Sequence, residues 1–260
     1  MRDVASETDE RGIPIDRVGI RDLHLPVRIR EKEGGYARVL GSIDASVRLP
    51  HIQRGTHMSR FLDILEAWSK QPVSMVEIEE TLQTVVGNFD APEASVRLNF
   101  KYFLPKVAPV SGKNSQLDYD CSFEGKMIGQ DFSFLIGCDV PIITLCPCSR
   151  EISEYGAHSQ RAALSVRVAW GTGDILWLED LIPLLESQGS CEIFPLLKRP
   201  DEKYVTETSY ENPKFVEDVV RDTIIALRDL NGVLGASAQC ESYESIHNHT
   251  AYAYAEWGDI

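Results

Sequence analysis

The sequence predicts an α+β protein in which helices cover one face of an antiparallel sheet. Stretches of alternating apolar and polar residues, typical of half-buried strands, occur in pairs, and stretches with apolar residues at helical spacing lie between the pairs. The order is two strands, two helices and two strands, followed by the same series again. We therefore expect two tandem ββααββ units, without an evident repeat in the sequence itself.

The first unit is expected over residues 23–128, after a polar N-terminal arm at residues 1–22. Its first helix is predicted to follow Thr56 as the N-cap residue. Its second helix is predicted to begin with Ser74 and Glu77, which have the spacing of a capping box. Period-two alternation places the strands of this unit at residues 23–30, 42–49, 96–102 and 117–123.

The second unit is expected over residues 129–260. One helix is predicted at residues 178–188, and a stronger one starts at Asn212-Pro213, a typical pair for the N-cap and first helical positions. Residues 190–212 have no clear period, so we expect an irregular loop, and loops of this length inside compact domains are usually functional. Strands are expected at residues 132–136, 164–170, 240–246 and 251–257.

Composition limits the classes of function. The chain has 260 residues, with 26 Lys and Arg against 40 Asp and Glu, so its net charge is −14. Such a field repels a long nucleic acid, whereas a small anion can still bind where a few cations share one pocket. The sequence shows neither a membrane-length apolar run nor an export signal. We therefore expect a cytoplasmic protein with no nucleic-acid or membrane partner, whose six cysteines are reduced.

The predicted sheets leave strand edges open. An open edge carries unpaired backbone groups unless another strand continues the sheet. We therefore expect a homo-oligomer, and a homotetramer in particular.

The densest cluster of reactive side chains combines cysteine and histidine. Cys146 and Cys148 flank a proline, and His158 follows Cys146 by twelve residues. Thiolate and imidazole are ligands that Zn²⁺ prefers, and three protein ligands plus water form a catalytic zinc site. The alternative is two buried thiols and a surface histidine. Spacing alone favours this alternative, because Cys-x-Cys is not the usual Cys-x-x-Cys zinc motif.

A second cluster lies near the C-terminus. Glu244, His247 and His249 bring together a carboxylate and two imidazoles, which act as general acids and bases or as metal ligands. Neighbouring strand residues face opposite sides of a sheet, so these groups share a pocket only if a turn intervenes, and Asn248 favours one. A polar surface hairpin explains the composition equally well.

The segment predicted to be irregular carries three cations, Lys198, Arg199 and Lys203. They suit phosphate groups, and Glu202 beside them is a candidate metal ligand. A solvated charged loop is the alternative explanation for all four.

Two further positions have ordinary structural explanations. Glu217 precedes Arg221 by four residues on a predicted helix, and a surface ion pair explains that spacing. His57 and Arg60 lie at the start of another predicted helix, where backbone N–H groups attract anions, although helix capping alone accounts for this segment.

The common phosphate-loop, dinucleotide-binding and Gly-x-Ser-x-Gly motifs are absent from the sequence. Segments spread over nearly the whole chain instead resemble the GTP cyclohydrolase IB family, the prokaryotic alternative form of GTP cyclohydrolase I. One departure is Ser159, where the family usually has Asn. The segments that carry the resemblance are Val18-Gly-Ile, Gly55-Thr-His-Met-Ser-Arg-Phe61, Ala108-Pro-Val-Ser-Gly112, Leu117-Asp-Tyr-Asp120, Leu145-Cys-Pro-Cys-Ser149, Lys198-Arg-Pro-Asp-Glu-Lys-Tyr-Val-Thr-Glu207, Glu211-Asn-Pro-Lys-Phe-Val-Glu-Asp218 and Glu244-Ser-Ile-His-Asn-His249.

The resemblance implies a tunnelling fold, in which two ββααββ units per subunit associate through their sheets into barrels with active sites at subunit interfaces. It implies hydrolysis of GTP to 7,8-dihydroneopterin triphosphate and formate. The product serves folate or related pterin and deazapurine (queuosine) pathways.

The resemblance also implies roles for individual residues. Cys146, His158 and Glu202 would hold Zn²⁺ or, more loosely, Mn²⁺ or Fe²⁺, and bound zinc would activate the water that attacks guanine C8. Glu217, His247 and His249 would act as general acids and bases beside Cys146, and Glu244 would bind the guanine N–H groups. The remaining substrate-binding residues, expected mainly at the triphosphate, are His57, Arg60, Lys198, Arg199 and Lys203.

Two other functions stay open. Another enzyme of the same fold, such as a nitrile reductase, would use a cysteine nucleophile and a nicotinamide cofactor, but its lysine-rich signature is not seen here. A non-catalytic metal- or pterin-binding oligomer would keep the fold without turnover.

Overall fold

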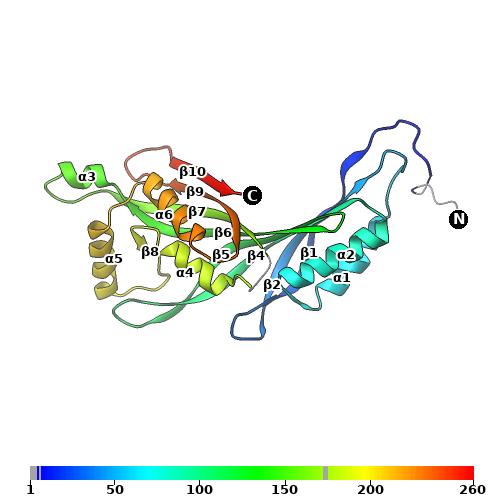
Figure 1. Cartoon of the computed structure of the whole chain (residues 1–260). Coiled ribbons are helices and arrows are strands. Elements are labelled where there is room, and N and C mark those ends of the chain that lie inside the picture. The colour runs from blue at the N-terminus through cyan, green and yellow to red at the C-terminus, as the bar shows by residue number, and fades with distance from the viewer. Residues whose placement is uncertain (1–4, 6, 172–174) are drawn as a thin grey trace. The chain divides into compact units, whose positions relative to one another are not determined.

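The structure is a computed structural model that describes residues 5, 7–171 and 175–260. It divides into two compact units, each built from two separate stretches of the chain (Figure 1). Unit 1 consists of Met1–Lys101 and Ser122–Ile136, and unit 2 consists of Tyr102–Cys121 and Gly137–Ile260. Within the described ranges, no helix is long and apolar enough to cross a membrane.

Unit 1 combines an antiparallel strand pair, two helices and parts of three long strands. The central strand β2 pairs antiparallel with β1 on one side and β4 on the other, and the short β3 pairs in parallel with β1. The elements in chain order are β1 (Ile15–Arg30), β2 (Tyr36–Leu49), α1 (Met58–Trp68), β3 (Pro72–Val73), α2 (Met75–Phe89), and parts of β4 (Glu93–Val107), β5 (Asn114–Ile128) and β6 (Asp131–Leu145).

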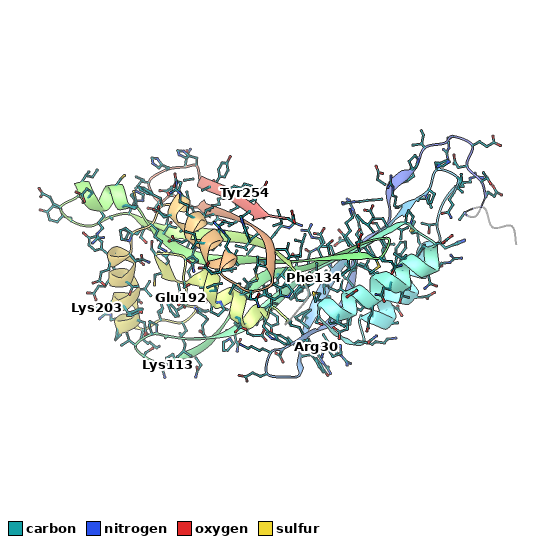
Figure 2. The ribbon with its side chains drawn as sticks, viewed as in Figure 1. Arg30, Lys113, Phe134, Glu192, Lys203 and Tyr254 are labelled. Carbon is teal, nitrogen blue, oxygen red and sulfur yellow. The ribbon has the colours of Figure 1, made fainter. Side chains whose placement is uncertain are left out.

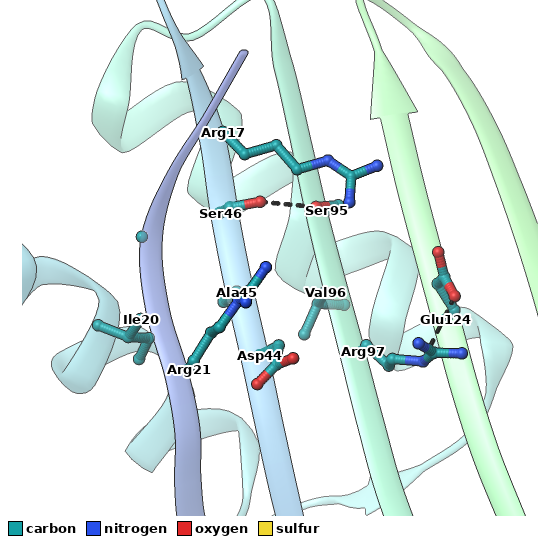
Figure 3. Close-up of a pocket in the computed structure, with 11 residues that line it drawn as sticks. Arg17, Ile20, Arg21, Asp44, Ala45, Ser46, Ser95, Val96, Arg97 and Glu124 are labelled. Atoms are coloured by element: carbon teal, nitrogen blue, oxygen red, sulfur yellow. Dashed lines mark hydrogen bonds and ion pairs between the residues drawn. The ribbon is translucent and has the colours of Figure 1, made fainter. Parts of the chain in front are cut away.

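Strand alternation and helix periodicity build the core of unit 1. Ile43 of β2 and Leu98 of β4 lie directly opposite each other, and both are fully buried. The rings of Phe61 on α1 and Phe89 on α2 stack with centroids 4.3 Å apart. The opposite face of the sheet carries the alternate, mostly polar residues, and Figure 3 views part of it with the helices behind the strands.

Unit 2 contains the other parts of β4, β5 and β6. β9 pairs antiparallel with β7 and with β10, β6 follows β7 in the sheet, and β8 pairs with β6. Its further elements are α3 (Pro147–Ile152), β7 (Ser159–Trp170), α4 (Leu178–Glu186), β8 (Cys191–Glu192), α5 (Arg199–Glu211), α6 (Val216–Arg228), β9 (Val233–Ser242) and β10 (Ala251–Gly258).

A buried ion cluster lies in unit 2. The ammonium of Lys106 on β4 donates to Glu186 Oε2 at 2.8 Å and to Glu192 Oε2 at 2.6 Å, and the Tyr119 hydroxyl donates to Glu186 Oε1 at 2.7 Å (Glu192 is labelled in Figure 2). Burial raises the pKa of Glu186, although the hydrogen bonds from Lys106 and Tyr119 act in the opposite direction. This carboxylate is therefore costly to bury and depends on its partners.

The mixed α+β class is confirmed, but the described residues contain two more helices in the second half than predicted. The predicted irregular loop at 190–212 is wrong, because α5 occupies most of it. Of its residues α5 buries only Asp201 and Ser209, so no apolar period marks it in the sequence. Asn212 is the C-cap of α5 rather than the N-cap of the next helix. The backbone N–H of Lys214 donates to the Leu145 carbonyl at 3.1 Å, and α6 begins only after that bridge.

The start of α2 was predicted correctly, and the start of α1 was placed one residue too early. The capping box is confirmed, because the backbone N–H of Ser74 donates to Glu77 at 2.8 Å at the start of α2. The N-cap residue of α1 is His57 rather than Thr56, and its side chain makes no capping hydrogen bond.

Strand limits also differ from the expected ones. β1 begins at Ile15, inside the segment 1–22 that was expected to be an arm. This start was not predicted because two register shifts against β2 interrupt the alternation of the strand. The strand predicted at 240–246 ends earlier, at Ser242, and begins at Val233. The start was missed because residues 235–238 are Gly, Ala, Ser and Ala, which show no contrast between apolar and polar side chains.

Candidate active site

The α3 segment holds Cys146 and His158 together in unit 2. Cys146 directly follows β6 and is the N-cap residue of α3. Its Sγ accepts the Ser149 N–H at 3.4 Å. The backbone N–H of Cys146 donates to the His158 carbonyl at 3.1 Å. Ser149 Oγ accepts the His158 N–H at 3.2 Å and donates to the Cys146 carbonyl at 3.1 Å. The chain thus makes a closed loop with the thiol and the imidazole at its two ends.

The imidazole of His158 is oriented through one of its ring nitrogens. His158 Nδ1 lies 2.9 Å from Gln160 Oε1 and 3.6 Å from Glu244 Oε2. An Nδ1–H that donates to the Gln160 oxygen leaves the lone pair of Nε2 free. Histidines that bind metals are usually held in this way, with the second ring nitrogen donating to an oxygen.

A series of hydrogen bonds between polar side chains connects Gln160 to Glu244. The amide nitrogen of Gln160 donates to Thr144 Oγ1 at 3.2 Å, Thr144 Oγ1 lies 3.1 Å from Ser242 Oγ, and Ser242 Oγ donates to Glu244 Oε1 at 2.9 Å. Thr144 and Ser242 are almost completely buried. Because each of these side-chain oxygen and nitrogen atoms has a partner, the hydrogen-bond network can fix the side chains that surround His158.

The pairing register of β7 and β9 explains why Gln160 and Glu244 lie close together. Ala162 of β7 lies opposite Ser242 of β9, and the N–H of Tyr243 still donates to the Arg161 carbonyl at 3.0 Å beyond it. Continuing the same antiparallel register places Gln160 opposite Glu244. The sequence reasoning missed Gln160, because the strand was expected only over residues 164–170, whereas β7 begins at Ser159.

The two other histidines lie in the connection between β9 and β10. The rings of His247 and His249 stack with centroids 4.9 Å apart, and both residues are exposed. Ser245 Oγ donates to Gln160 Oε1 at 3.4 Å, which ties this connection to the network. The turn expected around Asn248 is therefore present, since the strand ends at Ser242 and the chain bends before β10.

Glu217 is exposed in the first turn of α6. The surface pair expected with Arg221 is not seen, because Arg221 instead lies 3.6 Å from Asp218. Burial and the negative charge of Glu217 together raise the pKa of the Cys240 thiol on β9 to about 12. Glu217 is thus close enough to influence the interior of the sheet electrostatically.

The candidate phosphate-binding residues start α5. Lys198 is its N-cap residue, and its backbone N–H donates to Asp201 Oδ2 at 2.8 Å. Burial alone would raise the pKa of Asp201, but hydrogen bonds from Ser111 and from the N–H groups of Lys198 and Val110 hold it well below its usual range. This carboxylate, which the sequence reasoning did not single out, fixes the start of α5. Its signal was the acidic residue three positions after the N-cap.

The other residues at this helix start are exposed. Glu202 and Arg199 lie at the surface of α5, and Lys203, which is labelled in Figure 2, lies 3.7 Å from Glu207 as a surface pair. A groove of about 500 Å³ in unit 2 is lined by α5 residues and by Leu145, Ala157 and Ser159, the neighbours of Cys146 and His158. His57 and Arg60 belong to unit 1.

The residues fit a metal ion in part. Cys146 and His158 provide a soft and a borderline donor on two residues joined by a backbone hydrogen bond, and His158 Nδ1 is already engaged, as in metal-binding histidines. Over the described part of the chain, however, no group of three or more His, Cys, Asp or Glu side chains is arranged to hold a metal ion. Glu202 does not complete a group of three with Cys146 and His158 in the single chain.

Comparison with solved structures defines the class of fold. The chain is similar to the uricase from Arthrobacter globiformis, with a TM-score of 0.60 and 8% identity over 94% of this chain and 93% of that chain. At this identity the likeness concerns the fold alone. The chain is therefore an α+β protein with a uricase-like fold that carries a thiol, an imidazole and a carboxylate in one network.

Sequence comparison identifies the family. A family model described as "Type I GTP cyclohydrolase folE2" matches residues 1–253 of the chain. The chain is 46% identical over 253 residues to the GTP cyclohydrolase FolE2 of Thermosipho africanus (97% of this chain, 96% of the relative). It is 44% identical over 253 residues to that of Maridesulfovibrio salexigens (97% and 98%). The chain belongs to the type I GTP cyclohydrolase FolE2 family, and as a member it is a GTP cyclohydrolase.

Proposed function

We propose that this chain converts GTP to 7,8-dihydroneopterin 3′-triphosphate and formate, with the Cys146, His158 and Glu244 network as the chemical centre. The observation that carries the proposal is the backbone hydrogen bond between Cys146 and His158, with the thiol bonded to the Ser149 N–H and the imidazole bonded to Gln160. We further propose that the fold is a tunnelling fold and that the working form is a homotetramer in the cytoplasm. Its product would feed folate or related pterin synthesis.

Cys146 and His158 would hold Zn²⁺, or Mn²⁺ or Fe²⁺, and Glu202 is the proposed third ligand. When bound, such an ion lowers the pKa of water and so supplies the nucleophile for guanine C8 at neutral pH. Within the described residues Glu202 does not join the other two ligands, so its role needs a test of its own.

The side chains of the protein do the rest of the work. Glu244 would accept N–H groups of guanine, while Ser242 holds its other oxygen at 2.9 Å. Opening and reclosing the ring moves several protons, and Glu217, His247 and His249 are the proposed general acids and bases. Their exposure in the single chain leaves them accessible to a substrate.

The triphosphate would be bound by cations, because guanidinium and ammonium groups pair strongly with phosphate oxygens. The proposed residues are His57, Arg60, Lys198, Arg199 and Lys203.

The proposal is tested by incubating the purified protein with GTP and Zn²⁺ or Mn²⁺ and measuring the fluorescence of the oxidised neopterin product together with formate. We expect product only with added or retained metal. A nicotinamide-dependent absorbance change with a nitrile substrate, and none of the neopterin product, would contradict it. Metal or pterin binding without turnover would show a non-catalytic oligomer.

The third ligand is tested with Glu202→Gln. We expect metal content and turnover to fall together, because the amide keeps the shape and loses the charge. Unchanged metal content and turnover would remove Glu202 from the site while leaving the proposed reaction intact.

A further inference from the structure

Unit 1 contains a polar pocket of about 480 Å³ on the face of the sheet opposite its helices (Figure 3). Its floor is formed by Ser46 of β2 and Ser95 of β4, which lie directly opposite each other with their hydroxyl oxygens 2.9 Å apart. The volume is typical of a site for a small molecule. No residue of the candidate active site lines it.

The strand β1 presents two arginines to this pocket. Arg17 and Arg21 lie two residues before and two residues after Gly19, and both line the pocket together with Ser46. Figure 3 shows both side chains extending from β1 across β2, with Arg17 reaching toward Ser95. Within the described residues, neither guanidinium has an ion pair or a side-chain hydrogen bond.

The strand β1 is irregular on both sides of Gly19, next to the two arginines. Register shifts interrupt its pairing with β2 between Ile15 and Val18 and between Ile20 and Leu23, so an extra residue is inserted on each side of Gly19. Such bulges bend a strand and redirect side chains. A Cβ at Gly19 would lie only 1.9 Å from the Ala45 carbonyl oxygen, so β1 can approach the β2 backbone this closely between the two arginines only with glycine at this position.

The carboxylates of the pocket are already occupied. Glu124 lies 3.5 Å from Arg97, and Asp44 Oδ1 accepts the N–H of Asp22 at 2.9 Å. The lining therefore has three arginines against two carboxylates, and the two arginines with no partner among the residues that the structure describes are those of β1. In a chain of net charge −14, this local cation pair gives the pocket the opposite sign to the whole molecule.

Charge and spacing select the ligand. Arg17 and Arg21 are four residues apart on an extended strand, so their Cα atoms are separated by roughly 13 Å. A row of phosphate groups carries several charges and can contact both guanidinium forks, whereas a monovalent anion would gain too little against the overall negative field. We propose that this pocket binds the phosphate chain of a polyphosphate-bearing small molecule, through Arg17, Arg21 and the Ser46 and Ser95 hydroxyls.

The test measures binding of inorganic tripolyphosphate by calorimetry at constant ionic strength. The Arg17→Gln/Arg21→Gln double variant is expected to bind at the pocket at least about tenfold more weakly, because charge-assisted hydrogen bonds are lost. Ser95→Leu should weaken binding as well, since it fills the floor and keeps every arginine. The matched control, Arg48→Gln, removes a neighbouring exposed arginine of β2 that does not line the pocket, and its affinity should stay within about twofold.

Further results decide the proposal. Equal weakening in Arg48→Gln, or no weakening in the double variant, would overturn it. Arginine-dependent binding of guanosine, which has no phosphate, would also overturn it, whereas equal affinity for GTP and tripolyphosphate shows that phosphates alone are recognised. If light scattering shows that the double variant loses its subunit partners and keeps its anion affinity, the arginines are partner contacts instead. None of these measurements depends on turnover of GTP.

Discussion

The polar cluster of unit 2 and the arginine pocket of unit 1 hold their charged groups in different ways. In unit 2, His158, Glu244 and Cys146 each have a hydrogen-bond partner, and the buried hydroxyls of Thr144 and Ser242 hold the side chains around His158. In unit 1, Arg17 and Arg21 have no partner among the described residues. A network with fixed geometry suits bond making, because orientation is already established before a substrate binds. Free guanidinium groups suit a ligand that supplies the missing partners.

The largest difference is expected between two neighbouring cysteines. Cys146→Ser replaces the proposed thiolate ligand by a hydroxyl that stays protonated at neutral pH, so metal content and neopterin formation should both be lost. Cys148 is exposed, and Cys148→Ser should keep stoichiometric metal and substantial turnover. Metal analysis of both purified variants checks this, and the reverse pattern would show that the ligand assignment is wrong.

A comparably large effect, on stability rather than turnover, is expected for Lys106→Met. Removing this ammonium leaves the buried Glu186 without its cation and should cost about 3 kcal/mol of unfolding free energy. The raised pKa of Glu186 means that its protonated form is favoured in the folded state, so the cost is full at neutral pH and shrinks as the pH falls and the carboxyl takes up a proton.

Urea unfolding at about pH 7.5 and about pH 5 measures this dependence. Lys203→Met is the matched control, because Lys203 and its partner Glu207 are mostly exposed and their pair contributes less than about 0.5 kcal/mol. Equal losses at both pH values for Lys106→Met would show that the cost comes from lost packing against Phe194 rather than from a buried charge.

The next effect distinguishes two roles of Glu217. As a proton-transfer group, Glu217→Gln should lower kcat by roughly 10²-fold with little change in melting temperature. As a solvated residue of α6 it should change neither. Stopped-time neopterin assays with thermal unfolding of the same preparation decide between them, and Arg221→Gln on the same helix is the surface control.

The smallest effect on turnover is expected for Gln160, which acts through His158. Gln160→Met keeps the length of the side chain and removes the acceptor for His158 Nδ1, which should lower metal affinity or activity by roughly tenfold. Gln160→Glu keeps an acceptor oxygen and should restore part of the metal affinity. If both variants lose metal equally, the amide does not position the imidazole.

Much of the fold was predictable because it depends on alternation and capping. The capping box at Ser74 and Glu77 and the strand around residues 96–102 follow directly from the order of apolar and polar residues. α5 was not predictable in this way, since its surface is polar on nearly every side and a buried aspartate, not an apolar stripe, fixes its start. The first part of β1 was hidden by its bulges.

The candidate site was predictable as residue types but not as an arrangement. Cys146 and His158 could be named from their chemistry, and the closed loop now explains why twelve residues separate them. The supporting groups Thr144 and Ser242 could not be named, because hydroxyls are common and only the strand register brings these two together. Among the described residues no third His, Cys, Asp or Glu joins Cys146 and His158 in a group that could hold a metal ion, so no local pattern could have indicated one.

The discontinuity of unit 1 has a consequence for how the chain is made. Its second stretch, Ser122–Ile136, emerges from the ribosome only after twenty residues that belong to unit 2. Many of its contacts therefore join segments far apart in sequence, and such topologies fold slowly because distant segments must meet before their contacts can form. A chain released at Lys101 would lack the last strands of unit 1, so neither unit can be produced from one uninterrupted stretch of the gene.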